Sequence, residues 1–205
     1  MLYATPQQLK DLRQLKIVVI HPDDADGQLL TQQLQRIGCQ VQPLWPPVQS
    51  LPGDADVVFM VVRPDYLHLY RQLRTGWARG TRTPTLIAVV NYENPTIVSA
   101  VLELEAQAIL PSPVRSFGLL STLVLARKTH KQLSQQQQHI AKLQTKLLGQ
   151  RHVTEAKAIL MRTHQVSERQ AYDLLREQAM NKRSSIEGVA AAIVQANELL
   201  SLKKS

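Results

Sequence analysis

The chain has 205 residues, of which 44% are hydrophobic, and its formal net charge at pH 7 is +8. No apolar run approaches the ~20 residues that a membrane-spanning helix needs, and the N-terminus lacks the layout of a signal peptide. The sequence has a single cysteine, Cys39, which excludes an intramolecular disulfide framework. The six histidines are scattered and lack metal-ligand spacing. We therefore expect a cytoplasmic protein without a metal or other cofactor.

The first 113 residues predict an α/β domain with a parallel sheet. Short apolar runs rich in β-branched residues alternate with segments of helical periodicity, as expected for strands joined by helices that cover both faces. Strands are expected at 16–20, 39–44, 57–62, 86–90 and 107–110, and helices at 26–37, 66–73 and 95–106. Segment 45–54 contains too much proline for a full helix, so the second crossover should be short or irregular.

Five such units resemble the receiver domain of response regulators. Receivers have an acidic pair after the first strand, an acceptor aspartate ending the third, Thr or Ser ending the fourth, and lysine after the fifth. By strand alignment, this chain has at those positions His21-Pro22, Val61, Val89 or Val90, and Ser112. Asp23 and Asp24 lie nearby, but Val61 can neither accept phosphate nor coordinate a metal. We therefore expect a pseudo-receiver that is not phosphorylated and binds a protein regulator; a scaffold without a role of its own is the alternative.

The same domain contains a predicted basic loop around Gly76-Trp77-Ala78, formed by Arg71, Arg74, Arg79 and Arg82. A second nucleic-acid contact, a docking site for a protein and a simple solvated loop all agree with this composition. Trp45 and Trp77 are candidate interface anchors, with ordinary packing as the simpler interpretation.

Segment 114–149 contains no proline and predicts one long helix. Apolar residues recur in it at every seventh position, which is the spacing of a coiled-coil seam. The seam residues are Leu119, Ala126, Leu133, Ile140 and Leu147. The complementary positions are mixed, with Leu123 apolar but His130, Gln137 and Gln144 polar. We expect a parallel homodimer of modest stability; a lone helix packed on its own domain is the alternative.

Residues 153–194 predict three short amphipathic helices that share one buried face. Ser167 is the N-cap candidate of the second helix, with Glu168 in its first turn. The three apolar stripes comprise Val153, Ala156, Ile159 and Leu160; Ala171, Leu174, Leu175 and Ala179; and Ile186, Val189, Ala190 and Ile193.

This segment resembles the ANTAR domain, the RNA-binding module of antiterminator response regulators of the AmiR and NasT type. The resemblance rests on the order and spacing of Ala156-Lys157, Leu160-Met161, His164, Ala171, Leu174-Leu175-Arg176 and Ala179-Met180. Gln165 departs from the pattern, because the family usually has glycine there, which suits a left-handed helix cap. Glutamine must therefore adopt that conformation at some cost, or the helix must be capped differently. The residues interpreted as core are Ala156, Leu160, Ala171, Leu175, Ala179 and Met180.

The resemblance implies an antiterminator that binds paired hairpins in a leader mRNA, so that a terminator does not form. Lys157 and Arg176 match the family motif and are the first predicted RNA contacts. Four further residues continue the basic surface at helix ends: Arg162, Asn181, Lys182 and Arg183. Tyr172 is a candidate for stacking on a base or for packing between helices. AmiR-type regulators also imply silencing by a small-molecule-sensing negative regulator with a periplasmic-binding-protein-like fold.

Charge and proline divide the chain in the same way. Residues 1–126 contain 10 Lys and Arg against 10 Asp and Glu, whereas residues 127–205 contain 14 against 6. All 11 prolines occur at or before Pro113. Clustered positive charge favours a polyanionic partner, with a solvated helical surface as the alternative. We expect a pseudo-receiver in residues 1–113, a coiled-coil dimerisation helix in 114–150 and an ANTAR RNA-binding domain in 151–205.

Two other classes of function agree with parts of the pattern. One is a DNA-binding response regulator with a helix-turn-helix, which a competition between duplex DNA and hairpin RNA would separate. The other is a protein-interaction adaptor without RNA binding. An enzyme is not expected, because the sequence contains no nucleophile–base pair, phosphate loop or metal cluster.

Overall fold

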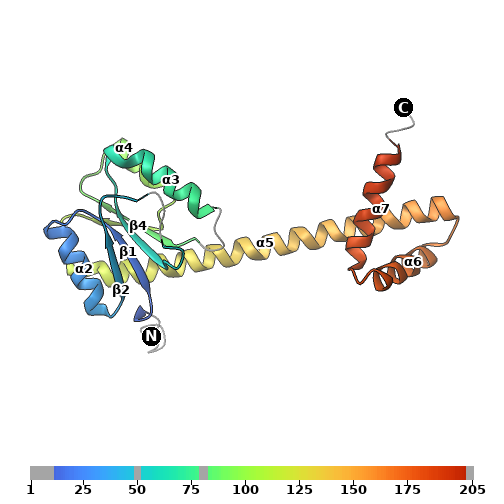
Figure 1. Cartoon of the computed structure of the whole chain (residues 1–205), viewed down its shortest axis with the longest axis horizontal. Coiled ribbons are helices and arrows are strands. Elements are labelled where there is room, and N and C mark those ends of the chain that lie inside the picture. The colour runs from blue at the N-terminus through green and yellow to red at the C-terminus, as the bar shows by residue number, and fades with distance from the viewer. Residues whose placement is uncertain (1–11, 49–51, 79–82, 202–205) are drawn as a thin grey trace. The chain divides into compact units, whose positions relative to one another are not determined.

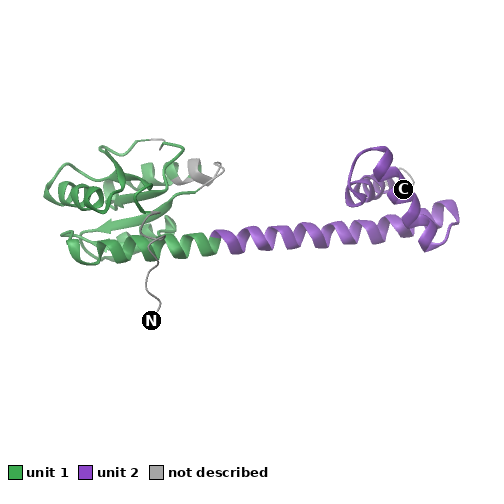
Figure 2. Ribbon diagram, turned by 90° about the horizontal axis from the view of Figure 1, so that it is seen from below, with its two compact units in different colours: residues 1–133 green, residues 134–205 purple. Residues whose placement is uncertain are grey.

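The computed structural model describes residues 12–48, 52–78 and 83–201. The chain divides into two compact units, residues 1–133 (unit 1) and residues 134–205 (unit 2), which Figure 2 distinguishes by colour. Figure 1 labels most of the elements, which in chain order are β1 (Lys16–Ile20), α2 (Ala25–Ile37), β2 (Gln40–Leu44), β3 (Val57–Val61), η1 (Pro64–Tyr66), α3 (Leu67–Ala78), β4 (Thr85–Val90), α4 (Pro95–Glu103), β5 (Ala108–Pro111), α5 (Ser116–His164), α6 (Glu168–Asn181) and α7 (Ile186–Ser201). None of the described helices contains a stretch apolar enough to cross a bilayer.

Unit 1 is built on a five-stranded parallel sheet in the order β2-β1-β3-β4-β5. This is the strand order of the flavodoxin-like and receiver folds, in which the winding direction changes between β1 and β3. Every residue of β3 and β4 is buried, since helices cover both faces of the sheet. The prediction of a receiver-like α/β domain is confirmed.

Each face of the sheet carries its own apolar cluster. On one face, α2 and the first turns of α5 contribute Leu30, Leu34 and Leu123. On the other, α3 and α4 contribute side chains such as Tyr70 and Ile97. The two layers of helices therefore hold the strand ends in a fixed arrangement from both sides.

The connection between β2 and β3 agrees with the prediction of an irregular crossover, because its described residues form no helix. Trp45, which follows β2, packs against both apolar clusters. Its ring meets that of Tyr66 in an edge-on arrangement with centroids 5.2 Å apart. Trp45 therefore has an ordinary packing role within unit 1.

Helix α3 is longer than predicted. It continues past the expected end at Leu73 to Ala78, so the predicted basic loop begins inside a helix. The guanidinium of Arg71 donates to both carboxylate oxygens of Glu103 on α4, at 2.6 and 2.9 Å. The loop interpretation is therefore wrong for Arg71, whose charge links two helices. Arg79 and Arg82 lie outside the described residues.

Helix α5 runs over 49 residues and covers both the predicted connecting helix and the predicted first helix of the bundle. Its one irregularity is a kink at Phe117 and Gly118, where Gly118 has a φ of 90°. The connecting helix and the first helix of the bundle are thus one continuous element.

The predicted seam of α5 separates into two parts. Leu119 and Ala126 are each 1% exposed and belong to the core of unit 1. The seam prediction is wrong for these two residues, because their own domain covers them. Leu133, Ile140 and Leu147 are 48%, 54% and 59% exposed.

Unit 2 packs the end of α5 with α6 and α7 around an apolar core, half of whose buried members are the small residues Ala156, Ala179 and Ala190. Helices approach closely where the side chains between them are small. At Gly149 of α5, an added Cβ would lie 2.8 Å from Cγ of Glu187 on α7. The predicted three-helix bundle is confirmed, with its first helix supplied by α5.

Candidate functional site

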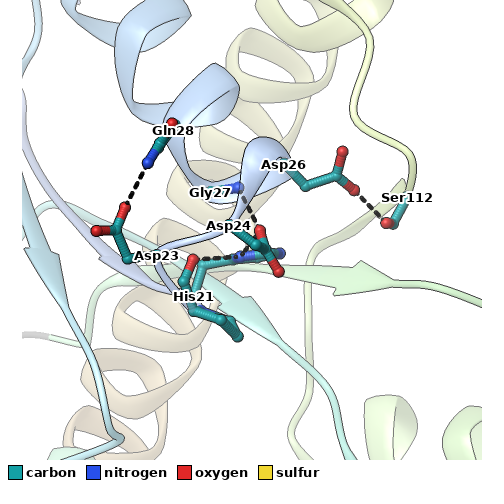
Figure 3. A network of polar contacts seen from close by, with 8 residues as sticks. His21, Asp23, Asp24, Asp26, Gly27, Gln28 and Ser112 are labelled. Atoms are coloured by element: carbon teal, nitrogen blue, oxygen red, sulfur yellow. Dashed lines mark hydrogen bonds and ion pairs between the residues drawn. The ribbon is translucent and has the colours of Figure 1, made fainter.

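The carboxyl edge of the sheet is where open α/β folds hold their chemistry. A network of polar contacts joins the loop after β1 to the start of α2 there (Figure 3). The Asp24 carboxylate caps α2 by accepting a 2.9 Å hydrogen bond from the Gly27 amide. Nδ1 of His21 lies 3.3 Å from the same carboxylate oxygen and 3.1 Å from the Pro22 carbonyl oxygen. Side chains of the loop between β1 and α2 thus hold the beginning of α2.

The neighbouring acidic side chains are engaged in the same way. Asp23 accepts a 2.9 Å hydrogen bond from the amide nitrogen of the Gln28 side chain. Asp26 accepts a hydrogen bond from the hydroxyl of Ser112, which stands where the receiver pattern has lysine (Figure 3). The carboxylates near this edge therefore have structural roles. Asp23 and Asp24 join the loop after β1 to the first turns of α2, and Asp26 joins α2 to the residue after β5.

The predicted acceptor position at the end of β3 holds the aliphatic side chain of Val61, which is 1% exposed. Its carbonyl oxygen accepts a 2.7 Å hydrogen bond from the Tyr70 hydroxyl, and burial raises the pKa of that phenol. Within the described ranges, no group of three or more His, Cys, Asp or Glu residues is placed to hold a metal ion. At this edge the carboxylates of Asp23, Asp24 and Asp26 are hydrogen-bonded within the domain, and Val61, at the acceptor position, has no side-chain oxygen.

In unit 2, Ser167 caps α6 as the sequence predicts, and Gln170 completes a capping box. The Ser167 hydroxyl oxygen accepts a 3.4 Å hydrogen bond from the backbone N–H of Gln170. The side-chain oxygen of Gln170 accepts a 2.9 Å hydrogen bond from the backbone N–H of Ser167. Gln165, in the turn just before this cap, has a φ of 52°. Of the two alternatives left open at this position, a left-handed glutamine and a different cap, the structure has the left-handed glutamine.

The far end of α6 closes with a second left-handed residue. Arg183 has a φ of 49°, and the Ser184 amide donates to the Ala179 carbonyl at 2.9 Å. The Arg183 amide donates to the Met180 carbonyl at 3.2 Å, which completes a Schellman motif. The motif satisfies the last carbonyls of α6 from the backbone, so Lys182 and Arg183 keep exposed side chains.

Five of the six predicted RNA contacts are exposed, namely Arg162, Arg176, Asn181, Lys182 and Arg183. The sixth, Lys157, has a side chain only 21% exposed, and its ammonium lies 2.6 Å from a carboxylate oxygen of Glu168. This hydrogen-bonded ion pair holds the pKa of Glu168 below its ordinary value. Lys157 therefore joins α5 to the first turn of α6, and Glu168 compensates its charge.

The exposed side of α6 holds two residues predicted to contact RNA or a base and one that was predicted to be core. Tyr172, Arg176 and Met180 follow one another at intervals of four, so they lie along one side of the helix. Tyr172 is 42% and Met180 71% exposed, which makes the assignment of Met180 to the core wrong. The adjacent inward row is Ala171, Leu175 and Ala179. Leu174, predicted in the same apolar stripe, is 37% exposed. The four-residue spacing distinguishes the exposed row from the inward row. Residue type alone does not, because both rows contain apolar residues.

Comparisons with known proteins identify the family. Residues 15–127 match the family described as AmiR, N-terminal, and residues 141–194 match the ANTAR domain. The aliphatic amidase regulator of Pseudomonas aeruginosa is 34% identical over 186 residues, which cover 91% of this chain and 94% of that protein. The chain belongs to the AmiR family of regulators.

Solved structures resemble this AmiR-family chain more distantly. A response regulator receiver protein from Burkholderia phymatum is 16% identical, with a TM-score of 0.44, and the match covers 56% of this chain and 96% of that one. A CheY-like response regulator from Mesorhizobium loti is 14% identical, with a TM-score of 0.44 and coverage of 55% and 98%. The receiver-like assignment rests on the strand order rather than on these likenesses.

Proposed function

We propose that this chain is a transcription antitermination regulator of the cytoplasm that binds hairpins in a leader mRNA as a homodimer. It acts by binding rather than by catalysis. The observation that carries the proposal is the ANTAR match over residues 141–194, together with the exposed basic side chains of that bundle. Sequence-specific RNA recognition mostly targets unpaired loop bases, which stack on aromatic or guanidinium groups while basic side chains hold the backbone.

The exposed row of α6 suits this kind of recognition. Tyr172 offers an aromatic face, Arg176 a planar cation and Met180 an adaptable thioether, and all three lie on one side of a helix whose other side is buried. Lys182 and Arg183 extend the positive charge beyond the C-terminal end of the same helix. We assign loop bases to this row and backbone phosphates to the flanking basic side chains.

Binding of the full chain to a two-hairpin RNA, compared with a scrambled RNA of equal length, tests the assignment. We expect Arg176→Gln and Tyr172→Ala each to weaken hairpin binding by roughly 5- to 100-fold, since stacking contributes about 1–3 kcal/mol per base. Arg115→Gln is the matched control, because Arg115 is exposed and belongs to unit 1. If Arg176→Gln loses no more affinity than Arg115→Gln, the bundle attracts RNA only by general charge. A wild-type chain without RNA affinity would favour an adaptor.

The homodimer is proposed to form through the exposed part of the α5 seam, Leu133, Ile140 and Leu147. Their seven-residue interval matches the repeat by which one helix pairs with a second copy of itself. A dimer would also present two bundles to paired hairpins, and the second contact would gain effective concentration from the first.

Sedimentation analysis separates this seam from a simple exposed helix. We expect Ile140→Lys to shift the chain towards monomer, because it places a charge at the centre of the seam. Gln138→Lys adds the same charge on another side of α5 and should leave the dimer intact. A wild-type chain that is monomeric at micromolar concentration would exclude the seam.

Control of this regulator is proposed to depend on a sequestering sensor protein rather than on phosphorylation. Val61 at the end of β3 and the internal hydrogen bonds of Asp24 and Asp26 support this view. A switch without phosphate needs a partner with different affinity for two states of the protein. Family membership suggests a small-molecule-sensing negative regulator of periplasmic-binding-protein-like fold as that partner.

Incubation with acetyl phosphate and magnesium, followed by intact-mass measurement, tests the first half of this proposal. We expect an unchanged mass, and a stable aspartyl phosphate on the purified chain would contradict it. Antitermination by this chain that still switches on and off in a strain without any sensor gene would contradict the second half.

A further inference from the structure

The middle of α5 carries a basic surface that the bundle does not include. No Asp or Glu occurs between Glu105 and Glu155 in the sequence. Within this acid-free stretch, every residue of 135–148 is exposed in the structure. The acid-free stretch between Glu105 and Glu155 contains four exposed lysines, Lys128, Lys131, Lys142 and Lys146, which we call the lysine stripe.

The four lysines share one face of the helix. At about 100° per residue they fall within an arc of roughly 60°, and at about 1.5 Å per residue the stripe is ~27 Å long. The residues between them on the same face are neutral or weakly basic: Gln135, Gln138 and His139. None of the four lysines forms an ion pair with another residue of the described part of the chain.

The stripe lies on a different side of α5 from the proposed dimer seam. The seam residues Leu133, Ile140 and Leu147 are centred roughly 145° around the helix from the lysines. When the seam occupies core positions of the heptad, the lysines fall at outer positions. A dimer formed through the seam would therefore leave both copies of the stripe open to a partner.

We propose that the lysine stripe binds the phosphate backbone of the transcript that flanks the hairpins. The inference rests on the proposed RNA binding by the bundle and adds a second, sequence-independent contact. Lysines attract phosphates as point charges and release the counterions that surround the nucleic acid. Glutamine side chains commonly donate hydrogen bonds to phosphate oxygens. The acid-free stretch around the stripe contains no carboxylate that would repel the strand.

The composition of the stripe favours RNA over an acidic protein. Protein interfaces are enriched in aromatic residues, Met and Arg and depleted in Lys, and their centres are apolar. The face that carries the stripe has no aromatic or aliphatic residue between Lys128 and Lys146 on its ~27 Å length. It has charge to hold a polyanion and no anchor to hold a protein.

The experiment uses the full chain with all four lysines changed to Gln, and a control with the same four changed to Arg. Lys, Gln and Arg are all good helix formers, so α5 stays helical in both, as circular dichroism will verify. Each protein is titrated with a two-hairpin RNA with and without a single-stranded flank, over a series of salt concentrations. A scrambled RNA of equal length measures hairpin discrimination.

We expect the wild-type chain to bind the flanked RNA more tightly than the bare hairpins. In the Gln variant this gain disappears, and the slope of log K against log salt falls by about 0.7 for each lysine that contacts a single strand. Hairpin discrimination stays unchanged, and the Arg variant keeps the wild-type behaviour.

Equal affinity and slope for wild type and the Gln variant, with discrimination intact, would overturn the stripe contact and leave the proposed function standing. A loss in the Arg variant as large as in the Gln variant would also overturn it, since the charge is preserved there. If the wild-type chain binds no RNA, the proposed function and the stripe contact both fail.

Discussion

Replacement of Gln165 by glycine should stabilise the bundle of unit 2. Gln165 follows the last residue of α5 and has a φ of 52°. A residue with a Cβ atom costs roughly 1–2 kcal/mol in the left-handed region, which glycine enters freely. Glycine also makes the unfolded chain more flexible, which offsets about 0.4–1 kcal/mol of that gain. The expected net increase in the free energy of unfolding is about 1 kcal/mol.

Thermal and chemical denaturation of the full chain, followed by circular dichroism, measures this change. For a unit of this size, 1 kcal/mol raises Tm by roughly 4–8 °C. The control is Gln165→Ala, which removes the polar group but keeps the Cβ atom and therefore the strain. If Gln165→Gly is no more stable than Gln165→Ala, relief of backbone strain is not the governing effect at this turn.

Three further substitutions test other parts of the structure. Gly27→Ala should lower the stability of unit 1 by about 1–3 kcal/mol in denaturant unfolding, because its Cβ would lie 2.2 Å from the Pro22 carbonyl oxygen. Leu175→Ala should cost about 2–5 kcal/mol of bundle stability, because Leu175 is 0% exposed and its removal leaves a cavity. Glu168→Gln should lose stability relative to wild type at neutral pH but not at low pH, measured by Tm across a pH series. The bond to Lys157 lowers the folded-state pKa of Glu168 from 4.5, so its contribution is present above that value and disappears as pH falls through the folded pKa.

Each of these expectations has an outcome that contradicts it. A Gly27→Ala protein within 0.5 kcal/mol of wild type, about the size of an ordinary surface effect, would mean that the α2 turn tolerates a side chain. A comparably small effect of Leu175→Ala would show that the bundle centre lies elsewhere. A difference between wild type and Glu168→Gln that persists unchanged into acid would show that the ion pair with Lys157 is not its source.

Local pattern determined the elements of this protein. The continuous apolar run of Val57–Val61 predicts a buried strand because a parallel strand covered on both faces needs apolar side chains on both sides. Helix ends depend on residues with a local role, such as Ser167, the predicted cap of α6, and Gly38, which ends α2 with a φ of 99°. The strained conformation of Gln165 was also predictable, because it depends on one turn and one missing glycine.

Only the tertiary structure decided how the side chains are used. The pairing of Lys157 with Glu168 spans 11 residues across a turn, and that of Asp26 with Ser112 spans 86, so no periodicity encodes either contact. The seven-residue repeat of α5 is uniform in sequence, yet Ala126 belongs to the core of unit 1, whereas Ile140 is exposed. Hydrophobic spacing states which residues share a side of a helix, whereas burial depends on which other elements reach that side.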